Sequence, residues 1–218
     1  MPEPLTLVAV GGGIIAILVR LARRYFELAK EAVDIVLGTV ALILALPLLV
    51  VCAAIIKISG KGPVVFTQHR VGQNGKLFKM YKLRTMYTDA ESDTGAVWAC
   101  EKDPRIIPVC RWMRRSHMDE LPQIINVVKG DMSLVGPRPE RPEILAELKR
   151  QYPHVHKRLA VRPGITGLAQ VRNGYDTSVD AFRSKLEADL EYIDQRKWAT
   201  ELKIMAATLG KLNDKGAH

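Results

Sequence analysis

The stretch AVDIVLGTVALILALPLLVVCAAII, residues 32–56, decides how this chain folds. It runs for about 25 mostly apolar residues, and at about 1.5 Å per residue one helix of that length crosses a hydrocarbon core of roughly 30 Å. Pro47 lies near its middle, where proline removes a backbone donor and clashes with the preceding turn. The stretch therefore predicts a membrane helix that is bent or broken at Pro47.

The charges on either side of this stretch do not favour one face of a membrane. Arg23, Arg24 and Lys30 come before or at its start, and Lys57 and Lys61 follow it. A spanning helix usually has its excess of Lys and Arg at the cytoplasmic end. Basic residues at both ends indicate a re-entrant helix-break-helix that enters and leaves by the cytoplasmic face. A kinked spanning helix stays open as the alternative, because membrane helices tolerate proline.

A shorter apolar segment, Leu5–Val19, precedes the first and contains three consecutive glycines at 11–13. Its length of about 15 residues reaches only roughly 22 Å, which is short for a bilayer. Glu3 stands at its leading flank where a secretory signal peptide has Lys or Arg. The segment is therefore either a short membrane helix or an interfacial one, and Arg20 favours a cytoplasmic position for its trailing end.

The composition of the chain favours an anionic partner. Its 218 residues contain 32 Lys and Arg against 23 Asp and Glu, a formal net charge of +9. Nucleic acid, an acidic lipid surface and phosphorylated small molecules all suit that charge. We expect no nucleic acid, because the chain has no recognised nucleic-acid fold signature or aromatic stacking platform, and the apolar stretch would have no role. The cysteines Cys52, Cys100 and Cys110 form no Cys-x-x-Cys pair, so neither a disulfide framework nor a zinc site is indicated.

From Ser59 onward the sequence predicts a cytoplasmic domain. Two strands, around 64–66 and 77–83, flank the turn signal at 72–75 and indicate a β-hairpin. A short helix around 124–128 ends at Gly130, and another runs from about Pro142 to Tyr152. Apolar residues at helical spacing predict two more helices, one with Phe182, Leu186, Leu190 and Ile193 and one with Leu202, Met205, Leu209 and Leu212. Core packing is the default reason for such stripes, and a membrane-surface position is the alternative for the last helix.

The acidic pair Asp119-Glu120 is the sharpest local feature of this domain. Pro122 fits in a first helical turn, so the pair lies at or just before a helix N-terminus, where backbone donors suit a phosphate. Ser116 and Asp119 also have capping-box spacing, and taken alone Asp119 is more simply an N-cap. Basic residues close by in the sequence favour phosphoryl transfer, in which one carboxylate attacks phosphorus and cations neutralise charge. These are Arg114, Arg115, Lys129, Arg138 and Arg141.

Several motifs follow one another along the chain in a fixed order. They are Ser59–Pro63, Arg70–Gly72, Lys82–Met86, Asp103–Arg105, Asp119–Gln123, Asn126, Lys129–Pro139 and Arg162–Gln170. Together they resemble the bacterial sugar transferase family, the monotopic polyprenyl-phosphate phosphoglycosyl transferases, from about Tyr25 to Leu212. The resemblance implies a re-entrant anchor with a central proline, here Pro47, although Leu46 stands where characterised members often have serine.

The resemblance also implies a specific reaction. Asp119 and Glu120 match the family's catalytic pair, in which the Asp attacks the β-phosphorus of a UDP-sugar and UMP leaves. Polyprenol (undecaprenyl) phosphate then takes the phospho-sugar from the enzyme, which predicts ping-pong kinetics. Glu120 would hold Mg²⁺. Arg138 is the best candidate for a nucleotide or phosphate contact, and Arg84, Arg114 and Arg162 come next, each with a structural ion pair as its alternative role.

The sequence thus predicts an α+β, mostly helical, monotopic membrane enzyme in three parts. Residues 1–24 form an N-terminal apolar segment with a basic flank, and residues 25–58 a re-entrant membrane helix broken at Pro47. Residues 59–218 form a cytoplasmic catalytic domain with C-terminal amphipathic helices. The enzyme would lie in the bacterial inner membrane and begin a lipid-linked glycan, such as an exopolysaccharide or lipopolysaccharide. A catalytically inactive membrane scaffold is the alternative, and the sugar and a homo-oligomeric state stay open.

Overall fold

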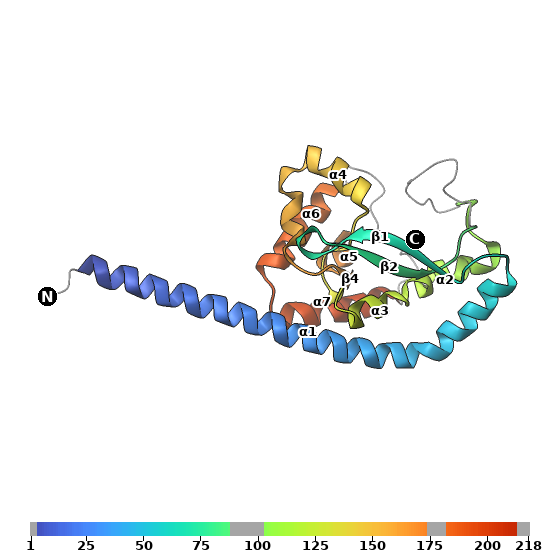
Figure 1. Ribbon diagram of the computed structural model, residues 1–218, viewed down its shortest axis with the longest axis horizontal. Helices are drawn as coiled ribbons and strands as arrows, with labels where there is room; N and C mark the ends of the chain where they lie inside the picture. The colour runs from blue at the N-terminus through green and yellow to red at the C-terminus, as the bar shows by residue number, and fades with distance from the viewer. Residues whose placement is uncertain (1–3, 88–102, 174–181, 213–218) are drawn as a thin grey trace.

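The computed structural model describes residues 4–87, 103–173 and 182–212 of the chain. Its largest element is α1 (Pro4–Ile58), a single helix of 55 residues. Figure 1 shows the first part of α1 extending away from the rest of the molecule and the later part curving beneath it. The globular domain, of which residues 59–87, 103–173 and 182–212 are described, lies on the concave side of this curve. Cys100, named above as one of three cysteines, lies outside the described residues.

The helix α1 does not divide at Pro47, where the sequence predicts a break, or between residues 24 and 25, where it predicts a boundary. It also continues through the glycines at 11–13, so residues 4–58 form one element. A proline bends a helix without ending it when the turns on both sides keep their hydrogen bonds. Figure 1 accordingly shows a curved helix rather than two helices, and the re-entrant path through a membrane stays a prediction.

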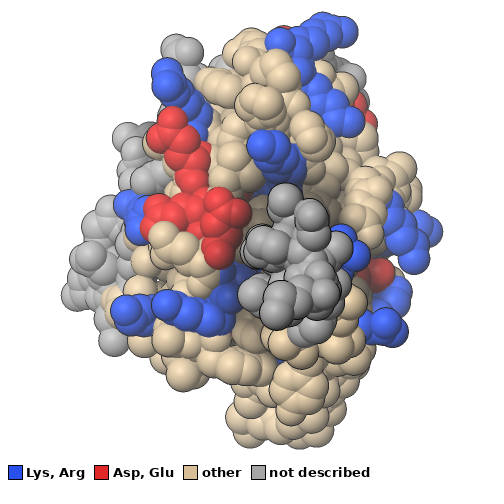
Figure 2. All heavy atoms as spheres, turned by 90° about the vertical axis from the view of Figure 1, so that its left-hand side faces the viewer, with Lys and Arg blue, Asp and Glu red and all other residues tan. Residues whose placement is uncertain are grey.

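The two faces of α1 differ in composition and contacts. Along 17–58 the helix is apolar and long enough to cross a membrane, and most of its surface is outside the core. Ile43 and Leu44, on the outer face, are 64 % and 75 % exposed. In Figure 2 the lowest part of the molecule, where α1 curves, carries no Lys, Arg, Asp or Glu side chains. The inner face contacts the domain at both ends, since Gly38 lies against Val127 and Cys52 belongs to a core cluster of the domain.

The predicted β-hairpin is present and forms the first part of the domain. Strands β1 (Val65–Val71) and β2 (Leu77–Leu83) pair antiparallel, with Val65 opposite Leu83 and Val71 opposite Leu77. A 3₁₀ turn at Gln73–Gly75 joins them. Asn74 and Gly75 both have positive φ there, as tight hairpin connections require.

A second, smaller sheet was not predicted. Strands β3 (Ser133–Val135) and β4 (Gly164–Thr166) pair in parallel. The two backbones approach so closely that a Cβ on Gly164 would lie 2.1 Å from the Gly136 nitrogen. Only glycine fits at such an approach.

The helices of the domain confirm the predicted ones and add others. The start of α3 (Gln123–Val128) follows Pro122, and Gly130 with φ of +78° ends it as predicted. Three further predicted helices are present. They are α4 (Pro142–Gln151), α6 (Phe182–Asp194) and α7 (Trp198–Leu212), so Trp198 begins α7. The domain also contains α2 (Arg111–Arg115), a 3₁₀ segment (Pro153–Ala160) and α5 (Leu168–Asn173).

Candidate functional site

Asp119 and Glu120 lie where the sequence places them, immediately before α3. They form a 3₁₀ turn with Met118, and Pro122 is the N-cap of α3, which begins at Gln123. His117, just before this turn, has φ of 55°. Such left-handed backbone is uncommon for residues other than glycine and tends to occur at functional sites. Neither the turn nor α3 has a side-chain cap hydrogen bond, so the simpler interpretation of Asp119 as an N-cap is not supported.

Glu120 is held by two cations from distant parts of the chain. Lys82 on β2 donates from Nζ to Oε1 at 2.8 Å. Arg138, in the loop after β3, donates from Nη2 to Oε1 at 2.5 Å and from Nη1 to Oε2 at 3.2 Å. This is the two-pronged geometry that makes arginine–carboxylate pairs strong and well oriented. The structure thus brings the predicted residues Glu120 and Arg138 together, and adds Lys82.

The two acidic side chains have opposite pKa shifts. Burial raises the pKa of Glu120, but the charges of Arg138 and Lys82 and their hydrogen bonds outweigh burial and hold this pKa well below its usual value. The pKa of Asp119 is raised by burial and then by the neighbouring negative charge of Glu120, against the weaker opposing effects of Lys82, Arg114 and His117. Adjacent carboxyl groups with diverging pKa values are typical of sites where the two groups have different tasks.

A buried asparagine fixes the helix that follows the acidic pair to the hairpin. Asn126, on α3, is fully buried. Its Nδ2 donates to the Lys79 carbonyl at 2.7 Å, and its Oδ1 accepts from the Tyr81 backbone N–H at 3.1 Å. Both bonds attach α3 to β2 one and three residues before Lys82. They set the distance between the cation on β2 and the carboxylates before α3.

Arg84 has a structural role at the end of α1. Its side chain is buried and donates to three backbone carbonyls, those of Lys61 at 2.8 Å, Gly60 at 3.0 Å and Ile56 at 3.2 Å. The last carbonyls of a helix have no partner within it, and Arg84 supplies one here. Its predicted contact with substrate stays a prediction.

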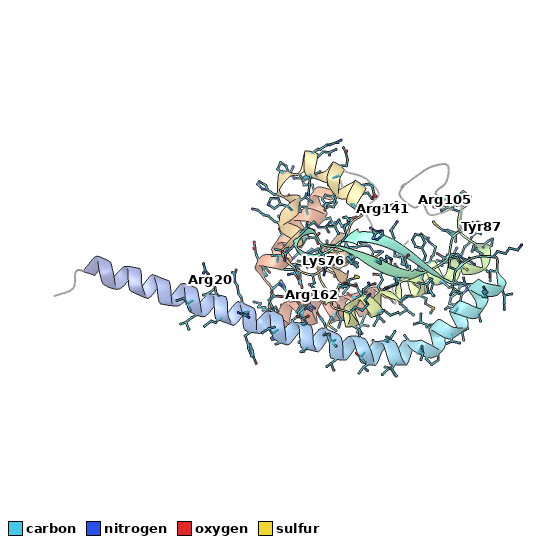
Figure 3. All side chains as sticks on the ribbon, in the orientation of Figure 1. Arg20, Lys76, Tyr87, Arg105, Arg141 and Arg162 are labelled. Carbon is cyan, nitrogen blue, oxygen red and sulfur yellow. The ribbon has the colours of Figure 1, made fainter. Side chains whose placement is uncertain are left out.

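Of the other two predicted arginines, one faces the acidic pair and one faces α1. Arg114 lies within 3.5 Å of the Thr85 hydroxyl, and its charge acts on Asp119. Arg162 forms ion pairs with Glu31 at 3.6 Å and Asp34 at 3.8 Å. Figure 3 shows Arg162 beside α1, whereas Arg141 and Arg105 lie on the side of the domain away from that helix. The structure therefore groups Arg114 with the site and gives Arg162 a role in holding α1.

The acidic pair meets the requirements of Mg²⁺ only together with a phosphorylated substrate. Among residues 17–87, 103–172 and 182–210, whose side chains are described, no group of three or more His, Cys, Asp or Glu side chains could hold a metal. Mg²⁺ in phosphoryl-transfer sites, however, commonly takes one or two carboxylates, with phosphate oxygens and water completing its shell. Within the described residues, Glu120 Oε2 accepts a hydrogen bond from Arg138, and its second lone pair is suited to a cation.

The role of Lys82 was missed in the sequence, although it belongs to one of the quoted motifs. Its carboxylate partner is 38 residues away, so no local pattern pairs the two. A lysine among strand residues usually indicates an exposed position. Lys82 instead has a pKa lowered by burial, opposed first by Glu120.

Comparison with known proteins gives this site a family context. The UDP-N-acetylgalactosamine-undecaprenyl-phosphate N-acetylgalactosaminephosphotransferase of Aeromonas hydrophila is 42 % identical over 168 residues, which cover 77 % of this chain and 40 % of that protein. The UDP-glucose:undecaprenyl-phosphate glucose-1-phosphate transferase of Escherichia coli strain K12 is 41 % identical over 192 residues, covering 85 % and 40 %. The exopolysaccharide production protein PSS of Rhizobium leguminosarum bv. phaseoli is 37 % identical over 185 residues, covering 83 % and 92 %.

The match extends across both the helix α1 and the domain. This chain spans about 40 % of the length of the Aeromonas and Escherichia relatives, and nearly all of the Rhizobium one. The model of one family covers residues 25–215, which include the later part of α1, the hairpin, the acidic pair and Arg138. This chain belongs to the bacterial sugar transferase family.

Proposed function

We propose that this protein transfers a sugar 1-phosphate from a UDP-sugar to a polyprenol phosphate, releasing UMP. The names of the Aeromonas and Escherichia relatives join undecaprenyl phosphate with a UDP-sugar, and both relatives match the part of this chain that holds the site. Donor and acceptor are both anionic phosphates. The cations Lys82, Arg114 and Arg138 around the acidic pair suit them.

The unequal environments of the two carboxylates carry this proposal. Glu120 is neutralised by a lysine and an arginine, so it remains ionised and fixed. Asp119 lies beside it with a raised pKa, because burial and the charge of Glu120 disfavour its ionised form. A more basic carboxylate is a better nucleophile once ionised. Asp119 therefore suits attack on phosphorus, and Glu120 suits orientation and charge balance.

In the first half-reaction a carboxylate oxygen of Asp119 attacks the β-phosphorus of the UDP-sugar. The bond between this phosphorus and the bridging oxygen breaks, and UMP leaves with that oxygen and the electron pair. The product on the enzyme is an acyl phosphate that carries the sugar. Arg138, held by Glu120, and Arg114 lie close enough to this pair to counter the charge that develops on the phosphoryl oxygens.

In the second half-reaction an oxygen of the polyprenol phosphate attacks the same phosphorus. The bond from phosphorus to the Asp119 oxygen breaks, which restores the carboxylate and gives polyprenol-diphosphate-sugar. One site therefore serves the donor and acceptor in turn, and ping-pong kinetics follow. Mg²⁺, bound by Glu120 together with the donor diphosphate, would lower the charge that a carboxylate meets when it approaches phosphorus.

The path of α1 supports a monotopic position in the bacterial inner membrane, with the domain on the cytoplasmic face. Lys30 and Asp34 near one end of residues 30–56 are buried against the domain, and so are Cys52 and Ile56 near the other end. A helix with both ends on the same domain cannot place them on opposite faces of a bilayer. The exposed apolar side chains between them can enter one leaflet, as a re-entrant helix does.

The test is UMP release by the purified full-length protein with Mg²⁺, undecaprenyl phosphate and a panel of UDP-sugars. We expect turnover with one donor or few, and no turnover by Asp119→Asn. Without the acceptor, wild type should release about one UMP per protein, as a covalent intermediate requires, and gain the mass of a sugar phosphate. Asp194→Asn, an exposed aspartate at the end of α6, is the matched control and should keep wild-type activity.

Two outcomes would contradict the proposal. Full turnover by Asp119→Asn would exclude Asp119 as the nucleophile. Absence of UMP release across the panel by folded, lipid-bound wild type would instead favour the catalytically inactive scaffold.

A further inference from the structure

The loop that carries Arg138 is fixed by hydrogen bonds that its backbone carbonyls accept from other parts of the chain. Four successive residues of this loop, 137–140, each have a carbonyl that accepts a hydrogen bond from another part of the chain. Two of the donors are backbone N–H groups and two are arginine side chains. The bonds run from Gly164 N to Pro137 O at 3.0 Å, Arg158 Nη2 to Arg138 O at 2.8 Å, Arg70 Nη1 to Pro139 O at 3.0 Å, and Val71 N to Glu140 O at 3.0 Å.

The loop therefore has little freedom to move. Pro137 and Pro139 have fixed φ angles, and their carbonyls accept hydrogen bonds from Gly164 and Arg70. Arg138 stands between them with its carbonyl on Arg158 and its guanidinium on Glu120. A shift of this one residue would disturb contacts on both sides at once.

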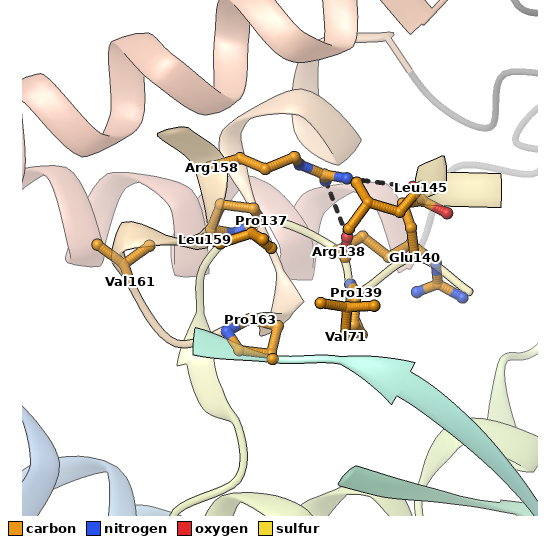
Figure 4. Close-up of a pocket in the computed structure, with 11 residues that line it drawn as sticks. Val71, Pro137, Arg138, Pro139, Glu140, Leu145, Arg158, Leu159, Val161 and Pro163 are labelled. Atoms are coloured by element: carbon orange, nitrogen blue, oxygen red, sulfur yellow. Dashed lines mark hydrogen bonds and ion pairs between the residues drawn. The ribbon is translucent and has the colours of Figure 1, made fainter. Parts of the chain in front are cut away.

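Arg158 is the least exposed of the arginines that hold this loop. It is 3 % exposed, and its Nη2 donates both to the Arg138 carbonyl and to Asp189 Oδ2 at 2.7 Å. Its Nη1 lies 3.6 Å from Glu140 Oε1. Figure 4 shows the side chain along the wall of a pocket, with interactions to Arg138 and Glu140. One guanidinium thus joins the loop to α6.

Stability alone is a weak reason for such an arrangement. A buried ion pair is often no better for stability than apolar side chains of the same volume, because both charges lose their hydration. The arrangement does, however, fix geometry, since a planar guanidinium has five donors in set directions. Here one of those donors binds the carbonyl of Arg138, the residue whose guanidinium binds Glu120.

We infer that Arg158 is a positioning residue, which sets the backbone of Arg138 so that the Arg138 guanidinium meets Glu120 with both prongs. This inference rests on the proposed function for its effect on turnover. Its structural part, the constraint on loop 136–141, does not depend on that function. Asp189 has its own part in the arrangement, because it fixes the guanidinium from α6.

The first test uses Arg158→Lys, which keeps a positive charge beside Asp189 but replaces the planar guanidinium, whose two terminal nitrogens meet Arg138, Asp189 and Glu140 in fixed directions, with a compact ammonium. We expect kcat for UMP release to fall by roughly 10- to 100-fold, a loss typical of a small displacement in an active site. The matched control is Arg196→Lys, which alters a partly buried arginine paired with Glu27 of α1, away from the loop. This control should keep kcat within about twofold of wild type.

A double-mutant cycle separates positioning from general destabilisation. If Arg158 acts through Arg138, the loss caused by Arg158→Lys should largely vanish when Arg138 is already Lys. Equal losses in both backgrounds would overturn the inference. Asp189→Asn keeps Arg158 but weakens the interaction that fixes its guanidinium. The loss of activity that it causes should depend on Arg138 in the same way, and this variant replaces Arg158→Lys if that protein does not fold.

Hydrogen–deuterium exchange gives a result that does not need activity. The amides of the non-proline residues in 136–141 should exchange faster in Arg158→Lys than in wild type or Arg196→Lys. Those of the β1–β2 hairpin should stay unchanged, apart from Val71, whose N–H donates to the Glu140 carbonyl of the loop. Unchanged exchange in 136–141 would overturn the inference even if activity falls. If wild type releases no UMP, the proposed function fails, and the exchange result still decides the constraint.

Discussion

Asp119 and Glu120 are adjacent in the sequence, yet their contributions to stability depend on pH in opposite ways. Glu120 has a folded-state pKa well below its usual value, so its stabilising effect is present above about 4.5 and is lost as the pH falls through the lowered value. Asp119 has a raised folded-state pKa. Its contribution to stability is therefore fully present below its usual value of 3.8 and is lost as the pH rises through the raised value.

Asp119→Asn should consequently raise the melting temperature at neutral pH while it abolishes UMP release. The substitution removes a buried charge that Glu120 repels, and keeps nearly the same volume. The gain over wild type should shrink as the pH falls toward 3.8, where Asp119 becomes protonated in both folded and unfolded chains. Thermal unfolding between pH 4 and 8, roughly the range that separates the two states, is the measurement.

Glu120→Gln is the matched comparison for this prediction. It leaves Lys82 and Arg138 without their carboxylate, so the melting temperature at neutral pH should fall. A lower melting temperature for Asp119→Asn at neutral pH would show that the Asp119 carboxylate is stabilised in a way that its surroundings do not explain.

The sequence identifies some of these residues and not others for a physical reason. Asp119, Glu120 and Arg138 lie next to prolines that define local backbone, and they are recognisable one stretch at a time. Lys82 and Arg158 acquire their roles from partners 38 and 31 residues away, across contacts that only the folded chain makes. Arg84 also lies in one of the quoted motifs, but its side chain binds backbone carbonyls at and just after the end of α1, those of Ile56, Gly60 and Lys61.

Among the secondary structure elements, the hairpin was predictable and the second sheet was not. The turn at 72–75 is a local signal, and the register of β1 with β2 follows from it. Strands β3 and β4 have three residues each, and about 30 residues and two helical segments separate them. Their pairing depends on Gly136 and Gly164, which allow the two backbones to approach closely. Neither glycine indicates in the sequence which segment it will pair with.

Gly164→Ala tests this close approach at the level of the element. The added Cβ would lie 2.1 Å from the Gly136 nitrogen, so the strands must separate. We expect a loss of at least about 1–3 kcal/mol of unfolding free energy, the usual range for overpacking, together with reduced UMP release, because Gly136 leads into the Arg138 loop. Thermal unfolding and the UMP assay are the measurements.

Gly210→Ala provides the control for that experiment. Gly210 lies in α7 with open space around its Cβ position, so alanine should stabilise the protein by about 0.5–1 kcal/mol. Equal effects of the two substitutions would mean that the β3–β4 contact is not tight.

For the molecule as a whole, one buried lysine joins α1 to the domain. Lys30 is 3 % exposed, and its ammonium contacts Asp34 on α1 at 2.9 Å, Ser133 on β3 at 2.9 Å and Glu201 on α7 at 3.0 Å. Lys30→Met removes the nearest cation from two buried carboxylates, leaving Asp34 with the more distant Arg162 at 3.8 Å, and should cost about 3–5 kcal/mol. Unfolding in detergent measures it. Arg183→Met, at an exposed pair on α6, should change stability by no more than about 0.5 kcal/mol.

Cysteine labelling tests how α1 lies in the membrane. Arg24→Cys and Lys61→Cys place thiols at exposed positions before and after the apolar stretch. A re-entrant path predicts that a membrane-impermeant reagent reaches both thiols only after the cells are opened. Labelling of residue 24 in intact cells, with residue 61 still protected, would establish a spanning helix instead. The background should carry Cys100→Ser, because Cys52 and Cys110 are already buried.

Arg84 binds the Ile56 carbonyl in the last turn of α1, and Cys52 and Ile56 lie in the same core cluster as Leu83 and Met113. The membrane helix is therefore part of the hydrophobic core and not a detachable tail. Cutting the chain at residue 59 to obtain a soluble enzyme would open that core and remove one of the three carbonyls to which Arg84 donates, that of Ile56. A foreign anchor in place of α1 would fit only if it reproduced this inner face. Useful simplified versions of this protein will have to shorten α1 from its exposed N-terminal end.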